Sequence, residues 1–258
     1  MSFRFCPNLS FLFNEVPFAS RYQKAKSLGF KGVESGFPFN ADLNAVIDAK
    51  NDSGIDHVLI NIYTGDTSKG ELGCACIPDM SSVFDDALDK TIDLAKSLNC
   101  KMIHLMSGKV IGPCTQQNDE AYLHNLQRAS KKLEQNDIIG LIEPINSITV
   151  PGYYLNDYGR ALTVIKSINS PNLKLMLDIF HLQHICGNIS HNIKTLLPYI
   201  GHIQIAQVPN RNEPNTPGEI NFPYVFKLLE HLNYSKWIGL EYVYKNGFDW
   251  ISDYGYSN

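Results

Sequence analysis

The chain has 258 residues, of which 44% are hydrophobic and 19% are charged, and its net charge is −4. This length and composition fit one large globular α/β domain with an ample core. The acidic balance argues against a surface that binds nucleic acid or an anionic membrane. No stretch approaches the roughly 20 apolar residues that cross a bilayer, and the first residues lack the pattern of a signal peptide. The six cysteines are scattered, as is typical of reduced thiols, so we expect a cytoplasmic protein.

Strands and helices are predicted to alternate along the whole chain, because short apolar runs alternate with segments of helical periodicity. The predicted strands are 3–9, 30–35, 56–62, 101–106, the stretch 140–146, 173–178, 201–206 and 238–243. The predicted helices are 18–28, 42–51, 82–97, 119–134, 157–168, 189–197 and 222–232. This alternation favours parallel pairing in a single (β/α)8 TIM-barrel domain over residues 1–258. An open doubly wound sheet is the alternative, but the chain lacks a glycine-rich phosphate turn after its first strand.

One long irregular segment, residues 63–80, interrupts this alternation between the third strand and the next helix. Loops of this length in compact domains are usually functional or disordered. In an α/β barrel this position belongs to the loops that surround the active site. We therefore consider Glu71, within this segment, as a lid residue that binds substrate, although a solvated loop charge explains it equally well.

Four predicted strands end in a residue with a side-chain oxygen, namely Glu143, Asp178, Gln204 and Glu241. Each alone has an ordinary explanation as a polar residue that caps the next loop, but four in series favour a site. The C-terminal ends of barrel strands converge on one face, so these residues would lie together. Three clustered carboxylates repel one another unless a cation joins them. An all-oxygen set suits Mg²⁺ or Mn²⁺, whereas zinc prefers more histidine or cysteine.

Several segments resemble the hydroxypyruvate isomerase family of the xylose-isomerase-like barrels, which also contain ketose 3-epimerases and an endonuclease group. The resemblance covers nearly the whole chain. It is carried by Leu141-Ile142-Glu143-Pro144-Ile145-Asn146, Leu177-Asp178-Ile179-Phe180-His181-Leu182-Gln183, Gly201-His202-Ile203-Gln204-Ile205-Ala206-Gln207-Val208-Pro209, Gly218-Glu219-Ile220-Asn221 and Gly239-Leu240-Glu241-Tyr242.

The resemblance implies that the four strand-end residues are metal ligands, and that Glu143 and Glu241 are also the proton donor and acceptor. It places His181 and Arg211 where relatives contact substrate oxygens. His104, at the end of the fourth strand, is a weaker candidate for substrate binding, with a structural role at least as plausible. The chain departs from the family at Leu72, where relatives often carry arginine. If that arginine holds a substrate carboxylate, the departure weakens the substrate assignment and leaves the metal site intact.

The implied reaction interconverts hydroxypyruvate and tartronate semialdehyde by proton transfer through an enediolate. A 2-oxotetronate isomerase or a ketose 3-epimerase would use the same four ligands. A metal-dependent endonuclease would want histidine ligands and a basic surface, and a non-catalytic sugar-acid binder would not need two opposed glutamates. The expected partner is a small hydroxy-oxo acid, with no nucleic acid and no membrane. The sequence is compatible with a homo-oligomer but does not determine the oligomeric state.

Overall fold

The computed structural model describes residues 3–38, 41–65, 70–243, 245 and 247–257. Residues 66–69 of the predicted long loop lie outside the described residues, and the rest of 63–80 is irregular, as predicted. All six cysteines are free thiols. No helix in the described ranges is both long enough and apolar enough to cross a membrane.

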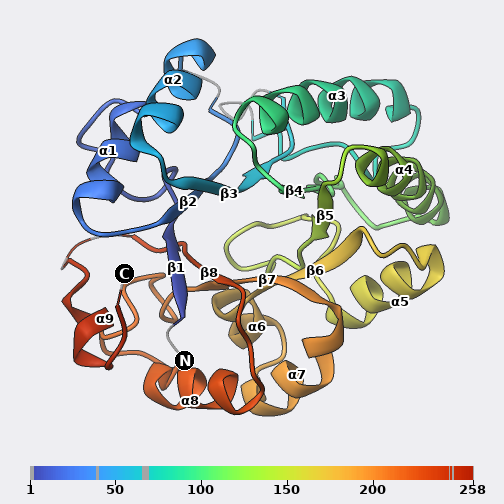
Figure 1. Cartoon of the computed structure of the whole chain (residues 1–258). Coiled ribbons are helices and arrows are strands. Elements are labelled where there is room, and N and C mark those ends of the chain that lie inside the picture. The colour runs from blue at the N-terminus through green and yellow to red at the C-terminus, as the bar shows by residue number, and fades with distance from the viewer. Residues whose placement is uncertain (1–2, 39–40, 66–69, 244, 246, 258) are drawn as a thin grey trace. The chain divides into compact units, whose positions relative to one another are not determined.

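Eight strands alternate with helices within the described residues, in agreement with the predicted order (Figure 1). The strands are β1 (Arg4–Pro7), β2 (Gly32–Ser35), β3 (Asp56–Asn61), β4 (Met102–His104), β5 (Ile139–Ile142), β6 (Leu173–Asp178), β7 (Ile200–Ile205) and β8 (Trp237–Leu240). The helices are α1 (Ser20–Ser27), α2 (Leu43–Ser53), α3 (Ser81–Ser97), α4 (Gln116–Gln135), α5 (Tyr158–Ile168), α6 (Ile179–Ile185), α7 (Ile189–Leu196), α8 (Phe222–His231) and α9 (Asp249–Asp253), with one 3₁₀ turn at Leu197–Tyr199.

The strands form one sheet in the order β1-β8-β7-β6-β5-β4-β3-β2. The strand pairings within it are parallel, and a parallel bridge between Asn8 and Glu34 joins the two ends of this order. An eight-stranded parallel sheet with a helix after each strand is the (β/α)8 TIM barrel. The predicted fold class is therefore confirmed.

The chain divides into two compact units. The first comprises Met1–Val58 and Leu177–Asn258, and the second comprises Leu59–Met176. The expectation of a single domain over residues 1–258 stays a prediction.

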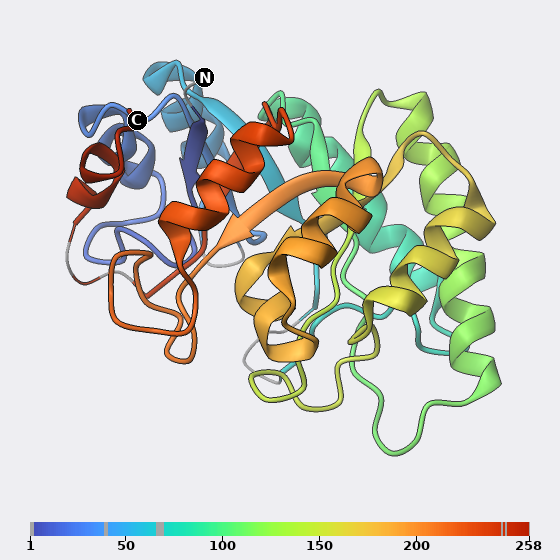
Figure 2. The ribbon, with the colours of Figure 1, turned by 90° about the horizontal axis from the view of Figure 1, so that it is seen from below.

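In the first unit, β1 pairs with β8, and β8 pairs with β7. Helix α6 packs against β7, and α7 lies beside α8 (Figure 2). The N-terminal strand and the C-terminal helix α9 are tied together by aromatic rings, because Phe5 packs edge-on against both Phe226 of α8 and Trp250 of α9. Helix α9 was not predicted, since five residues are too few to show periodicity. Its position depends on the buried Trp250.

In the second unit, Leu59 of β3, Leu141 of β5 and Met176 of β6 form a buried cluster. Helix α4 packs closely on β5 at Gly140, where an added Cβ would lie 2.8 Å from the Leu133 side chain. A side chain at position 140 would therefore push the helix away from the strand. This packing fixes the strand that delivers Glu143.

Candidate active site

Three of the four predicted ligands belong to the first unit and follow one another around its part of the sheet. Asp178 is the last residue of β6, Gln204 lies near the end of β7, and Glu241 comes directly after β8. Asp178 and Gln204 are buried, and the side chain of Glu241 is 13% exposed. Asp178 also caps α6, since its Oδ1 accepts a hydrogen bond of 2.8 Å from the backbone N–H of Phe180. Helix α6 was not predicted, because a seven-residue helix that starts at a strand end gives no clear period.

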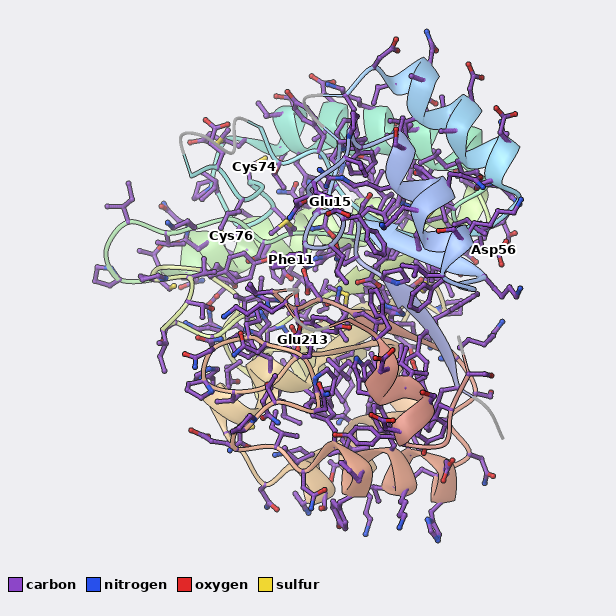
Figure 3. The ribbon with its side chains drawn as sticks, turned by 90° about the vertical axis from the view of Figure 1, so that its left-hand side faces the viewer. Phe11, Glu15, Asp56, Cys74, Cys76 and Glu213 are labelled. Carbon is purple, nitrogen blue, oxygen red and sulfur yellow. The ribbon has the colours of Figure 1, made fainter. Side chains whose placement is uncertain are left out.

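Arg211 joins two of these carboxylates. Its Nη2 lies 3.2 Å from Oδ2 of Asp178 and 2.9 Å from Oε2 of Glu241, and its Nε donates to the Glu241 carbonyl at 3.1 Å. The guanidinium lies over the rings of Phe11 and Phe180, with its carbon 4.9 and 5.0 Å from the two ring centroids. Phe11, which is labelled in Figure 3, comes from the loop after β1. The predicted site residue Arg211 is thus fixed beside two predicted ligands.

Burial disfavours the ionised form of both the Asp178 and the Glu241 carboxyl groups, although Arg211 lies beside them. Removal from water raises the pKa of Asp178, and Arg211 only partly opposes the effect. Burial likewise raises the pKa of Glu241 to about 8, and the negative charges of Asp178 and Glu34 add to the shift against the opposing effect of Arg211. A carboxyl group with a pKa near neutrality is suited to exchange protons at physiological pH.

His181 lies on α6 in the same unit and is buried. Its Nε2 is 3.7 Å from Oδ2 of Asp178. The structure therefore places two predicted substrate contacts, His181 and Arg211, beside Asp178. Whether either touches a substrate stays a prediction.

Gln204 is held by a carboxylate to which the sequence analysis gave no role. Its Nε2 donates to Oε1 of Glu34 at 2.7 Å. Its Oε1 is buried and has no hydrogen-bond partner among the residues that the structure describes. A buried amide oxygen without a donor is costly, and it is an atom type that binds Mg²⁺ or Mn²⁺. The donor set of Asp178, Gln204 and Glu241 therefore fits a hard divalent cation.

The fourth predicted ligand belongs to the second unit. Glu143 comes directly after β5 and is buried, and its Oε2 lies 3.7 Å from Nε2 of His104, the last residue of β4. Burial lowers the pKa of His104 to about 3, so this imidazole is neutral at physiological pH. The distance between Glu143 and His104 does not test whether Glu143 joins the other three ligands or whether His104 contacts a substrate. Both stay predictions.

Glu71 lies elsewhere in the second unit. It is exposed and, with Leu72, lines a cavity of about 520 Å³ whose walls include Tyr63, Lys90 and Lys109. Neither Glu143 nor His104 lines this cavity. The role of Glu71 in substrate binding stays a prediction.

Comparison with known proteins places this geometry in a family. A model described as a xylose isomerase-like TIM barrel matches residues 22–255. The hydroxypyruvate isomerase of Escherichia coli K12 is 38% identical, with 97% of this chain and 99% of the relative covered. A putative hydroxypyruvate isomerase of Danio rerio is 42% identical over 97% of this chain and 95% of the relative. The 2-oxo-tetronate isomerase of Cupriavidus necator is 35% identical over 97% and 98%, respectively.

Solved structures share this fold. A protein of Brucella melitensis described as an AP endonuclease of family 2 has a TM-score of 0.93 and 36% identity, with 98% of this chain and 99% of that chain covered. A D-psicose 3-epimerase of Clostridium cellulolyticum H10 has a TM-score of 0.76 at 19% identity, over 98% of this chain and 89% of that chain, and this likeness shows the fold alone. The chain therefore belongs to the hydroxypyruvate isomerase family of the xylose isomerase-like TIM barrels.

Proposed function

We propose that this protein is a metal-dependent isomerase that interconverts hydroxypyruvate and tartronate semialdehyde. The observation that carries the proposal is the first unit's donor set, in which Arg211 joins the carboxylates of Asp178 and Glu241, and the buried amide oxygen of Gln204 has no hydrogen-bond partner among the described residues. Relatives that are named isomerases of small hydroxy-oxo acids support the same class of reaction.

The proposed ligands are Asp178, Gln204 and Glu241 from the first unit and Glu143 from the second. Inclusion of Glu143 rests on the family resemblance and on its place at the end of β5. When bound, Mg²⁺ or Mn²⁺ would supply Lewis-acid stabilisation of the negative charge that develops on substrate oxygens.

The side chains carry the proton transfers. In hydroxypyruvate the carbonyl is at C2, and the product carries it at C3, so C3 loses a proton and C2 gains one. Glu143 and Glu241 would abstract and return these protons on opposite faces of the planar enediolate, while the hydroxyl proton moves from the C3 oxygen to the C2 oxygen. In the protein without metal, burial raises the pKa of Glu241 to about 8, so this carboxyl group can hold a proton near neutral pH.

Arg211 and His181 would position the substrate. The guanidinium, held over two aromatic rings, can pair with a substrate carboxylate, and His181 can donate to a second oxygen. Arg211→Ala should therefore lower kcat/KM for hydroxypyruvate far more than kcat/KM for a neutral ketose. Equal losses in kcat/KM for the two substrates would show that Arg211 does not bind the substrate carboxylate.

The test is an NMR time course of the purified protein in D₂O with Mg²⁺ and hydroxypyruvate, with 2-oxotetronate and a free ketose in parallel. We expect tartronate semialdehyde to form and to acquire deuterium at C2, and we expect excess EDTA to stop the reaction. The variant Glu241→Gln serves as the inactive comparison. Its matched control is Glu134→Gln, because Glu134 is an exposed acid on α4.

The outcome distinguishes the related activities. Turnover of 2-oxotetronate alone would move the assignment toward the Cupriavidus relative. Turnover of a free ketose alone would indicate an epimerase. If no substrate reacts in the presence of metal, the isomerase proposal fails, and metal-dependent cleavage of abasic-site DNA becomes the next assay. Cytoplasmic location and oligomeric state stay predictions.

A further inference from the structure

Glu34 is a buried carboxylate that collects donors from two other strands and the loop after β1. Its Oε1 accepts hydrogen bonds from Nδ2 of Asn8 at 3.0 Å and from Nε2 of Gln204 at 2.7 Å. Its Oε2 lies 2.6 Å from Nε2 of His202 and 3.6 Å from the thiol of Cys6. All five side chains are at most 3% exposed.

These contacts give the Glu34 carboxylate a fixed position. Each oxygen already has two partners, so rotation of the group would break several hydrogen bonds at once. The backbone is also held, because the Glu34 carbonyl accepts from the N–H of Leu9 at 2.7 Å. On the remaining side lies Gly239, where an added Cβ would be 2.4 Å from Oε2. No residue larger than glycine fits there without displacing the carboxylate.

The protonation of the surrounding groups agrees with an acceptor at this place. Burial and the adjacent Glu34 charge raise the pKa of the Cys6 thiol, so the sulfur keeps its proton and donates it. Nδ1 of His202 is buried without a hydrogen-bond partner in the described part of the chain. Its Nε2 donates to Oε2 of Glu34 at 2.6 Å.

The fixed Glu34 carboxylate determines the orientation of the Gln204 carboxamide. Its two ends differ in chemistry, and only the NH₂ end can meet a carboxylate. The Glu34 contact therefore fixes the amide with Nε2 toward Glu34 and Oε1 away from it. That oxygen is the buried atom that has no partner among the described residues. A rotated amide would set an oxygen against the carboxylate and offer a cation two N–H donors.

We propose that Glu34 is a positioning residue that determines which end of Gln204 faces the metal. This inference rests on the proposed function, in which Gln204 is a ligand. It explains why a neutral amide can occupy the position beside a buried carboxylate, since a carboxylate at 204 would be repelled by Glu34. It also makes the donor atom an oxygen, which favours Mg²⁺ and Mn²⁺ over softer ions.

The test measures the dissociation constant of Mn²⁺ by the EPR signal of the free ion, without substrate. Glu34→Gln is nearly isosteric, but it replaces one of the two acceptor oxygens by an NH₂ group. It can no longer accept from all four donors, so the amide of Gln204 is no longer held in one orientation with its ligand oxygen toward the metal. We expect the affinity to fall about 10- to 100-fold, as for other residues that orient metal ligands. Glu134→Gln changes the net charge equally on the exposed face of α4 and should leave the affinity unchanged.

A reversed pair separates positioning from general damage. In Glu34→Gln/Gln204→Glu, the new amide can donate to the new carboxylate, whose other oxygen is left for the metal. We expect Gln204→Glu to recover at least about tenfold in affinity in the Glu34→Gln background and to give no gain in the wild-type background. The same factor in both backgrounds would overturn the positioning role.

The wild-type measurement distinguishes failure of the positioning role from failure of the proposed function. If the wild-type protein binds Mn²⁺ and folded Glu34→Gln protein binds it equally well, the positioning role fails and the proposed function stands. If the wild-type protein neither binds Mn²⁺ nor isomerises any tested substrate, the proposed function fails, and the positioning role fails with it.

Discussion

Replacing Arg211 by alanine should destabilise the metal-free protein much more than the protein saturated with Mn²⁺. The guanidinium lies within 3.2 Å of oxygens from both Asp178 and Glu241, and the Arg211 side chain is only 18% exposed. Its removal leaves two largely buried carboxylates facing each other. Loss of one partner from such a buried ionic group costs up to about 3–5 kcal/mol of unfolding free energy when both carboxylates are ionised. For a chain of this size that corresponds to a decrease in Tm on the order of 10 °C.

A bound divalent cation would replace the missing positive charge. The loss in saturating Mn²⁺ should then shrink to about 1–2 kcal/mol, which reflects the remaining hydrogen bond to the Glu241 carbonyl and the two ring contacts. Urea unfolding of wild-type and Arg211→Ala protein, each in EDTA and in Mn²⁺, measures the difference.

Two control variants make this measurement specific. Arg211→Lys keeps the charge and should lose less than Arg211→Ala in EDTA. Arg128→Ala removes a partly exposed arginine that pairs with Asp85, and it should cost at most about 1 kcal/mol in either condition. Equal losses for Arg211→Ala with and without Mn²⁺ would refute the reasoning, because they would show that guanidinium and metal do not balance the same charges.

Three further results are expected. Glu143→Gln and Glu241→Gln should each lower kcat at least about 10²–10⁴-fold while far-UV circular dichroism stays unchanged, and wild-type turnover in either would remove that residue from proton transfer. Because burial lowers the pKa of His104 from 6.5 to about 3, the unfolded chain binds a proton between these values that the folded chain does not. His104 should therefore reduce stability as the pH falls below 6.5, by about 2 kcal/mol between pH 7.5 and 5, and urea unfolding of His104→Gln should show a shallower pH dependence. Iodoacetamide at pH 8 should modify the exposed Cys114 within minutes and spare Cys76 (Figure 3), whose pKa burial raises to about 12; equal labelling of both peptides by mass spectrometry would contradict this assignment.

Some parts of the site had no usable signal in the sequence. Glu34 looked like any other polar residue at a strand end, and its partners Asn8 and His202 are far from it along the chain. Nothing in local composition tells a buried acceptor for four donors from a solvated loop carboxylate. A weak signal existed in Gly239, since a glycine inside an apolar strand often marks a close approach of another group. Only the register of β1 with β8 and the position of β2 reveal that this group is Glu34.

The sequence by itself determined the alternation of eight strands with helices, and it identified Asp178, Gln204 and Glu241 as strand-end oxygen donors. Those features are local, because periodicity and the end of an apolar run are set by neighbouring residues. Tertiary structure decided which oxygen or nitrogen of each donor is already paired. Arg211 occupies one side of Asp178 and Glu241, and Glu34 takes the amide nitrogen of Gln204. Such pairings depend on the parallel order of strands that lie up to 170 residues apart, a relation that no local pattern contains.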